Sequence, residues 1–68
     1  MSAREAASAL SEGNALRKQG LVDGAVAAYR RAVELAPGFP AGYYNLAIAL
    51  REQGDLRGAT LALSLIHI

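Results

Sequence analysis

The chain has 68 residues, a mass of 7.1 kDa and a formal net charge of +1. A chain of this length forms one small domain at most, and it buries only about 60% of the surface that the unfolded chain exposes. The absence of cysteine excludes disulfides and thiolate metal sites, and the single histidine cannot form a metal site alone. The near balance of 7 basic and 6 acidic residues excludes a strongly charged nucleic-acid-binding arm or an acidic tail.

The first predicted element is a helix over residues 4–19. Ser2 and Glu5 have the spacing of a capping box, so Ser2 is its expected N-cap and residues 1–5 its N-terminal cap. Gly20 supplies the left-handed residue that ends this helix.

Three further helices are expected along the rest of the chain. They are placed at residues 22–36, at residues 41–53 and after Asp55, which is the expected N-cap of the last one. Pro37 and Gly38 stop the first of the three. Pro40 stands where the first turn of a helix tolerates proline. Gly54 ends the third predicted helix as Gly20 ends the first.

Neither end of the sequence has the pattern of a targeting or membrane segment. The first nine residues lack the apolar core of a secretory signal. The most apolar stretch, residues 61–68, is far too short to span a bilayer. We therefore expect a cytoplasmic chain without a membrane partner.

The sequence repeats itself when it is shifted by 34 residues. The matches keep one phase without a gap: residues 15–17 match 49–51, residues 19–20 match 53–54, residues 24–25 match 58–59, and Ala28 matches Ala62. Self-similarity at a fixed period of this size indicates stacked repeats. The small residues Gly13 and Ala25, and likewise Ala47 and Ala59, would let the helices of each pair approach closely, and Ala32 would admit the next unit.

These residues resemble the tetratricopeptide repeat (TPR) family, whose unit has this 34-residue period. The matching positions are Gly13, Leu16, Gly20, Ala25, Tyr29, Ala32 and Pro37, followed by Tyr43, Leu46, Ala47, Leu50, Gly54 and Ala59. The departures are Ala9 at the tryptophan position, Glu12 at the leucine position and Leu21 where aspartate is common.

The resemblance implies an all-α fold in which antiparallel helix–turn–helix units stack as a short α-solenoid of three to four helices. The first unit would span residues 6–39, and a second, incomplete unit would span residues 40–68. Because repeats of this kind bury their faces on one another, we expect a monomer of marginal stability and further repeats in the intact chain.

The repeat pattern fails near the end of the sequence. Ile66 falls where the family has alanine, and the charges expected on the outer face of the last helix are missing. Residues 63–68 also match the translation of a sequencing-library adapter, so our hypothesis is a non-native tail. A genuine hydrophobic C-terminal helix is the alternative.

In TPR proteins the first helix of each unit lines the concave groove, where partners bind. The resemblance therefore implies a partner-binding face formed by Leu10, Asn14, Arg17, Lys18, Tyr44, Asn45, Ile48, Arg51 and Glu52. The asparagines would bond a peptide backbone or the neighbouring helix, the basic residues would meet carboxylates, and Tyr44 would supply a flat anchor. Asn14 and Asn45 match two positions of the chaperone-binding carboxylate clamp, but Leu10 stands where that clamp has lysine.

The sequence holds no constellation that predicts catalysis. His67 lies in the doubtful tail, and the serines have no histidine and aspartate arranged with them. The repeated glycines are turn and packing residues, not a phosphate-binding loop. We expect no cofactor, no metal and no nucleic acid, and a function as a protein-interaction scaffold. The alternative is the accessory repeat array of a larger enzyme, such as a glycosyl- or sulfotransferase.

Overall fold

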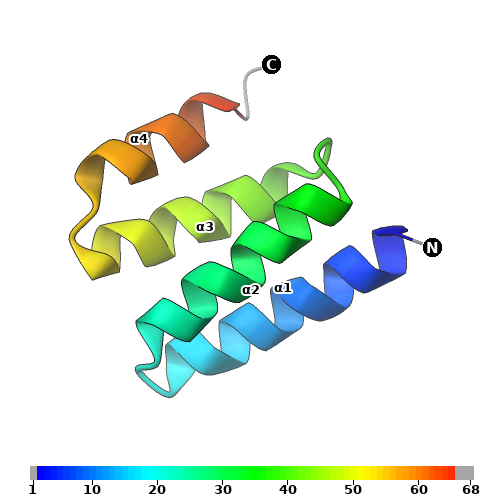
Figure 1. Ribbon diagram of the computed structural model, residues 1–68, viewed down its shortest axis with the longest axis horizontal. Helices are drawn as coiled ribbons and strands as arrows, with labels where there is room; N and C mark the ends of the chain where they lie inside the picture. The colour runs from blue at the N-terminus through cyan, green and yellow to red at the C-terminus, as the bar shows by residue number, and fades with distance from the viewer. Residues whose placement is uncertain (1, 66–68) are drawn as a thin grey trace.

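The computed structural model describes residues 2–65, in which the backbone forms helices and no strands (Figure 1). The helices are α1 (Ser2–Lys18), α2 (Val22–Leu35), α3 (Pro40–Gln53) and α4 (Leu56–Ser64). They lie side by side in chain order, each packing on the next, and α1 also touches α3. This arrangement confirms the predicted all-α class and the short array of stacked helices.

The helix boundaries agree with the sequence-based expectation to within two residues. Ser2 is already helical, so the first turn of α1 includes the residue expected to be its cap. α2 ends at Leu35, one residue before the expected end. α3 begins at Pro40 itself, because the first turn of a helix has no use for the N–H that proline lacks.

The α1–α2 and α3–α4 turns have the same backbone geometry. Gly20 and Gly54 adopt φ values of +80° and +93°, in the left-handed region that favours glycine. The residue after each glycine donates its N–H to a carbonyl five residues earlier: Leu21 to Leu16 (2.9 Å) and Asp55 to Leu50 (2.8 Å). Both turns are therefore Schellman motifs, which satisfy the last carbonyls of α1 and α3.

Asp55 begins α4 as the sequence predicts. Its Oδ1 accepts a hydrogen bond from the backbone N–H of Gly58, 2.9 Å away. This bond satisfies one of the N–H groups that a helix start leaves without an intrahelical partner.

The closest approach of α1 and α2 lies at Gly13. A Cβ added to Gly13 would lie 2.5 Å from Cε1 of Tyr29, so the tyrosine ring occupies the space that a side chain would need. Tyr29 is the largest side chain that is fully buried in the described part of the chain, and Ala25 is fully buried near it. The expectation that small side chains let this pair nest is confirmed, and Ala47 and Ala59 are buried at the matching places in the second pair.

A second close approach joins α2 to α3. A Cβ on Gly42 would lie 2.9 Å from Cγ1 of Val33, and Ala32 on α2 is fully buried. Ala49 of α3 is fully buried as well. Ala32 was the predicted contact for the next unit, whereas Gly42 was not recognised from the sequence.

Two expected core positions are only half-buried. Leu16 packs against the edge of the core, and Tyr43 lines a shallow groove on the outer side between α2 and α4. Leu56, Leu61, Leu63 and Leu65 are exposed on or beside α4. α4 includes Leu63 and Ser64, so part of the proposed non-native tail is helical, while residues 66–68 lie outside the described part of the chain.

We predict that Gly13→Ala lowers the free energy of unfolding by about 1–2 kcal/mol. Displacing the Tyr29 ring costs more than the roughly 1 kcal/mol that alanine gains over glycine within a helix. Urea unfolding followed by circular dichroism measures the change. Gly24→Ala is the matched control, because Gly24 also lies inside a helix and a Cβ there would be 3.4 Å from Cδ1 of Leu16, an ordinary van der Waals contact. Equal stability of the two variants would contradict the close approach at Gly13.

Candidate functional site

The residues predicted to bind a partner lie on α1 and α3, and we call this surface the α1–α3 face. Its members are Leu10, Asn14, Arg17, Lys18, Tyr44, Asn45, Ile48, Arg51 and Glu52. On α3, Tyr44, Ile48 and Arg51 are spaced four and three residues apart, which places them on one stripe of the helix.

The hydroxyl of Tyr29 links the buried core to this face. It donates a hydrogen bond to Oδ1 of Asn14 over 2.5 Å, joining α2 to α1. Burial raises the pKa of the Tyr29 hydroxyl above its ordinary value; the Arg17 guanidinium acts in the opposite direction, and the Glu52 carboxylate raises the pKa further. Arg17 of α1 and Glu52 of α3 thus both lie within electrostatic reach of one hydroxyl.

Arg17 holds a buried nitrogen near this hydroxyl. Its Nη1 is shielded from solvent and has no hydrogen-bond partner among the described residues. Buried donors are normally paired, so this guanidinium retains unused bonding capacity.

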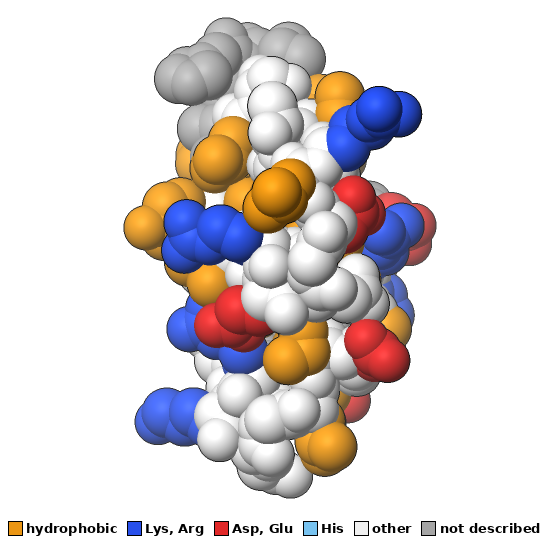
Figure 2. Space-filling model, turned by 90° about the vertical axis from the view of Figure 1, so that its left-hand side faces the viewer, with side chains coloured by type: hydrophobic (Ala, Val, Ile, Leu, Met, Phe, Trp, Pro, Cys, Tyr) orange, Lys and Arg blue, Asp and Glu red, His pale blue; other side chains and the backbone are white. Residues whose placement is uncertain are grey.

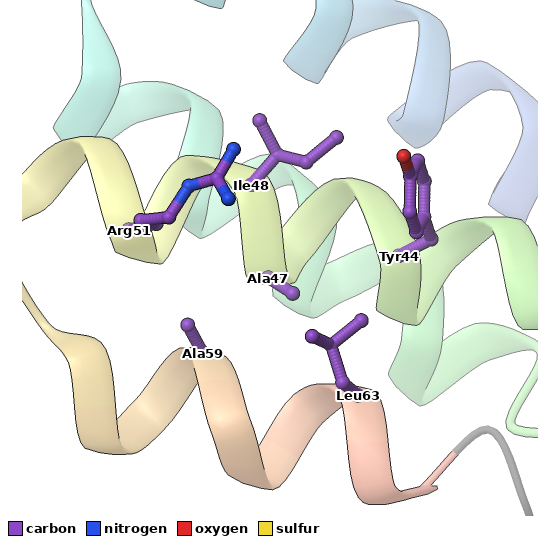
Figure 3. A pocket seen from close by; sticks show the side chains of 6 residues that line it. All are labelled: Tyr44, Ala47, Ile48, Arg51, Ala59 and Leu63. Atoms are coloured by element: carbon purple, nitrogen blue, oxygen red, sulfur yellow. The ribbon is translucent and has the colours of Figure 1, made fainter.

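A small hollow lies between α3 and α4 at the edge of the α1–α3 face (Figure 3). It has a volume of about 90 Å³ and is lined by Tyr44, Ala47, Ile48, Arg51, Ala59 and Leu63. Figure 3 shows Ala47 and Ala59 facing one another across it, with Arg51 toward one end. The lining is apolar apart from Arg51 and the Tyr44 hydroxyl, so it suits an aliphatic group with a negative charge beside it.

The structure sorts the predicted binding residues by accessibility. Tyr44 is 56% exposed, and Arg51, Lys18 and Glu52 are also exposed. Asn45 and Ile48 are half-buried. Leu10 is half-buried and packs against the core, so it presents only part of its side chain to a partner.

One of the two alternatives that the sequence offered for Asn14 is present, whereas the hollow was not predicted from the sequence. The Oδ1 of Asn14 is engaged by Tyr29, so the bond between helices is present and only the rest of that amide faces a partner. The hollow between α3 and α4 follows from packing, since its lining residues are spread over 20 positions of the sequence.

Charges elsewhere on the surface are mixed. The edge that carries the α1–α2 and α3–α4 turns shows basic and acidic side chains interspersed with hydrophobic ones (Figure 2). Arg31 and Glu12 form an exposed ion pair of 3.8 Å between α2 and α1. This edge therefore has no large, uniformly basic patch of the kind that nucleic-acid binding requires.

Within residues 2–65, no helix is long and apolar enough to cross a membrane. The same part of the chain has no group of three or more histidine, aspartate or glutamate side chains placed to hold a metal ion.

A comparison of the sequence with known protein families shows to which family the chain belongs. The TPR repeat matches residues 13–59, which is more than half of the sequence. The chain belongs to the TPR family. Comparisons with curated proteins and with solved structures gave no significant match. TPR repeats are protein–protein interaction modules, and the matched segment runs from Gly13, at the α1–α2 contact, to Ala59, at the α3–α4 contact.

We predict that the free energy of unfolding of this TPR protein decreases less steeply at alkaline pH in the Tyr29→Phe variant than in the parent protein. Below pH 10 the hydroxyl is protonated in both the folded and unfolded states and adds no pH dependence. Above this pH the unfolded chain releases the proton first, because the folded pKa is raised, so the free energy of unfolding falls as the pH increases. Urea unfolding between pH 8 and pH 12 tests this.

Tyr44→Phe is the control, because it removes a hydroxyl from a tyrosine that is 56% exposed and outside the buried core. That variant should keep the alkaline decrease of the parent protein. At neutral pH, Tyr29→Phe should also cost about 0.5–1.5 kcal/mol for the lost hydrogen bond to Asn14. A steep alkaline decrease in Tyr29→Phe equal to that of the parent would refute the assignment.

Proposed function

We propose that this TPR chain binds an extended segment of a partner protein across the α1–α3 face. The proposal keeps the division into units at residues 6–39 and 40–68, with α1 and α3 as the first helix of each. The observation that carries it is the hollow beside Tyr44, where Figure 3 shows the aromatic side chain of Tyr44 and the Arg51 guanidinium toward opposite ends of an aliphatic stretch that includes Ile48. Aromatic and arginine side chains are the residues that most often dominate binding energy at interfaces.

The charge on this face favours an acidic partner. The residues assigned to this face include three basic side chains and one acidic one: Arg17, Lys18, Arg51 and Glu52. The face is therefore more basic than the chain as a whole, which has a net charge of only +1.

The repeat sets the spacing of the two charges on the partner. Arg17 and Arg51 occupy the same position of α1 and α3, 34 residues apart in the chain. α1 and α3 touch over only a small patch, so the distance of about 8–10 Å between the axes of directly packed helices is a lower bound for their separation, and an extended peptide advances about 3.3 Å per residue. A partner peptide crossing both helices therefore meets these arginines with carboxylates at least about three residues apart.

We predict that random peptides selected on the full 68-residue protein are enriched in acidic residues at this spacing. For a selected peptide, we expect Arg17→Glu with Arg51→Glu to raise the Kd at least tenfold, because two attractive contacts become repulsive. Fluorescence anisotropy of the labelled peptide gives the Kd, and amide chemical shifts locate the site.

Arg4→Glu with Arg30→Glu makes the same change in net charge outside the face and should leave the Kd within about twofold. Shifts confined to the outer groove at Val33 and Tyr43 would contradict the proposal, as would selected peptides without acidic residues whose binding both double variants retain.

A further inference from the structure

The groove on the outer side of the array, which we call the outer groove, lies between two helices that do not pack on one another. α3 forms its floor with Tyr43, Leu46 and Leu50, and α2 and α4 lie on either side of it. Within residues 2–65, α2 and α4 make no direct helix contact, so the floor stays open between them. The groove has a volume of about 310 Å³, which is enough for several aliphatic side chains.

The α4 side of the outer groove is a ridge of exposed leucines. Leu61 is 61% exposed and Leu65 is 46% exposed, and they are four residues apart on one side of the helix. A shift of 34 residues carries them to Ala27 and Arg31 of α2, so the ridge is particular to α4. Ala27 stays exposed although α3 packs on α2, so a further helical pair stacked on α4 would leave Leu61 uncovered.

Each copy of the chain therefore carries both halves of a contact, the outer groove and the leucine ridge along its edge. Surfaces of this kind suit a two-fold contact, in which the ridge of each copy lies in the groove of the other. Insertion of the leucines removes both the ridge and the groove floor from water, which provides the driving force.

Charge favours one direction for the inserted helix. Successive helices run in opposite directions, so α2 and α4 of one copy run the same way (Figure 1). An antiparallel α4 from a second copy places its first turn, with the exposed Arg57, beside Glu34 near the end of α2. A parallel α4 would bring Arg57 toward Arg30 instead, where like charges repel.

We propose that two copies of this chain associate through the outer groove, with their α4 helices antiparallel about a two-fold axis. Leu61 of each copy packs between Val33 and Tyr43 of the other, and Arg57 pairs with Glu34, so that each contact occurs twice. All five residues precede the proposed non-native tail, so the inference stands whatever the origin of that tail. None of them belongs to the α1–α3 face, so the inference is independent of the proposed function.

Sedimentation equilibrium of the full 68-residue protein at increasing concentration tests the proposal. We expect a monomer that becomes a dimer below about 1 mM, within the range of weak association. Leu61→Ser should raise the Kd of the dimer at least tenfold, because two buried leucines are lost from each dimer. Leu56→Ser is the matched control and should leave the Kd within about twofold, because Leu56 is an exposed leucine of the same helix that does not line the groove.

Exchange of the charge pair gives a test that a nonspecific apolar contact would fail. Arg57→Glu and Glu34→Arg each place like charges opposite one another in a dimer of identical copies, so each should raise the Kd at least tenfold. An equimolar mixture of the two variants should restore association, because every pair between them again joins an arginine to a glutamate. Each new charge suits the dipole of its helix end, so both variants should keep the fold.

The control mixture combines Arg4→Glu with Glu5→Arg, two changes at exposed residues of α1 that give the same net charges. These variants should dimerise like the parent protein, alone and mixed. Three results would overturn the inference. They are a monomer at every concentration up to about 1 mM, equal effects of the two leucine substitutions, and a charge-exchange mixture that associates no better than its components.

Discussion

Close backbone approach at two glycines is the constraint on which the structure depends. Gly13 leaves room for the Tyr29 ring between α1 and α2, and Gly42 leaves room for Val33 between α2 and α3. Most other buried residues are alanines, which contribute little area each, so short distances between helices must replace large side chains. Tyr29 is the largest of the buried side chains that are not alanine, which also include Val26, Leu46 and Leu50, and a fully buried aromatic side chain contributes up to about 3 kcal/mol. A small chain whose core is mainly alanine retains this fold only while its helices can touch.

Tyr29 also connects the core to the surface that we assign to partner binding. Its ring fills the α1–α2 contact, while its hydroxyl holds Asn14 and lies near Arg17 and Glu52. Asn14 of α1 is therefore positioned by a group that cannot move without disturbing the core. A binding face supported in this way is largely organised before the partner arrives, which reduces the ordering cost of association.

The sequence determined the helices and their order because local residues set them. The helix ends are marked by Gly20, Gly54, Pro40 and Asp55. Each of these residues favours a helix end through its own local backbone geometry or capping bond, without help from distant residues. The packing role of Gly42 was not predicted, because by intrinsic propensity a glycine inside a helix only weakens that helix. The benefit of glycine at this position is visible only in the folded protein, where Val33 lies against it. Likewise, a 34-residue shift shows which residues are equivalent but not which are covered: Tyr29 is buried, and Leu63 at the matching position is not. The identity of a partner depends on a second molecule, about which a single sequence contains no information.

The packing of each helix almost entirely on its neighbours in the chain has a kinetic consequence. Contacts join α1 to α2, α2 to α3 and α3 to α4, and only a small patch joins α1 to α3. Such a low contact order favours folding within microseconds to milliseconds, since no long loop has to close first. Structure can then spread along the array from whichever hairpin forms first, as in a one-dimensional chain of coupled units. Within residues 2–65, α4 contacts α3 alone, so we expect it to exchange its amide hydrogens fastest and to be the first of these helices to unfold under mechanical force.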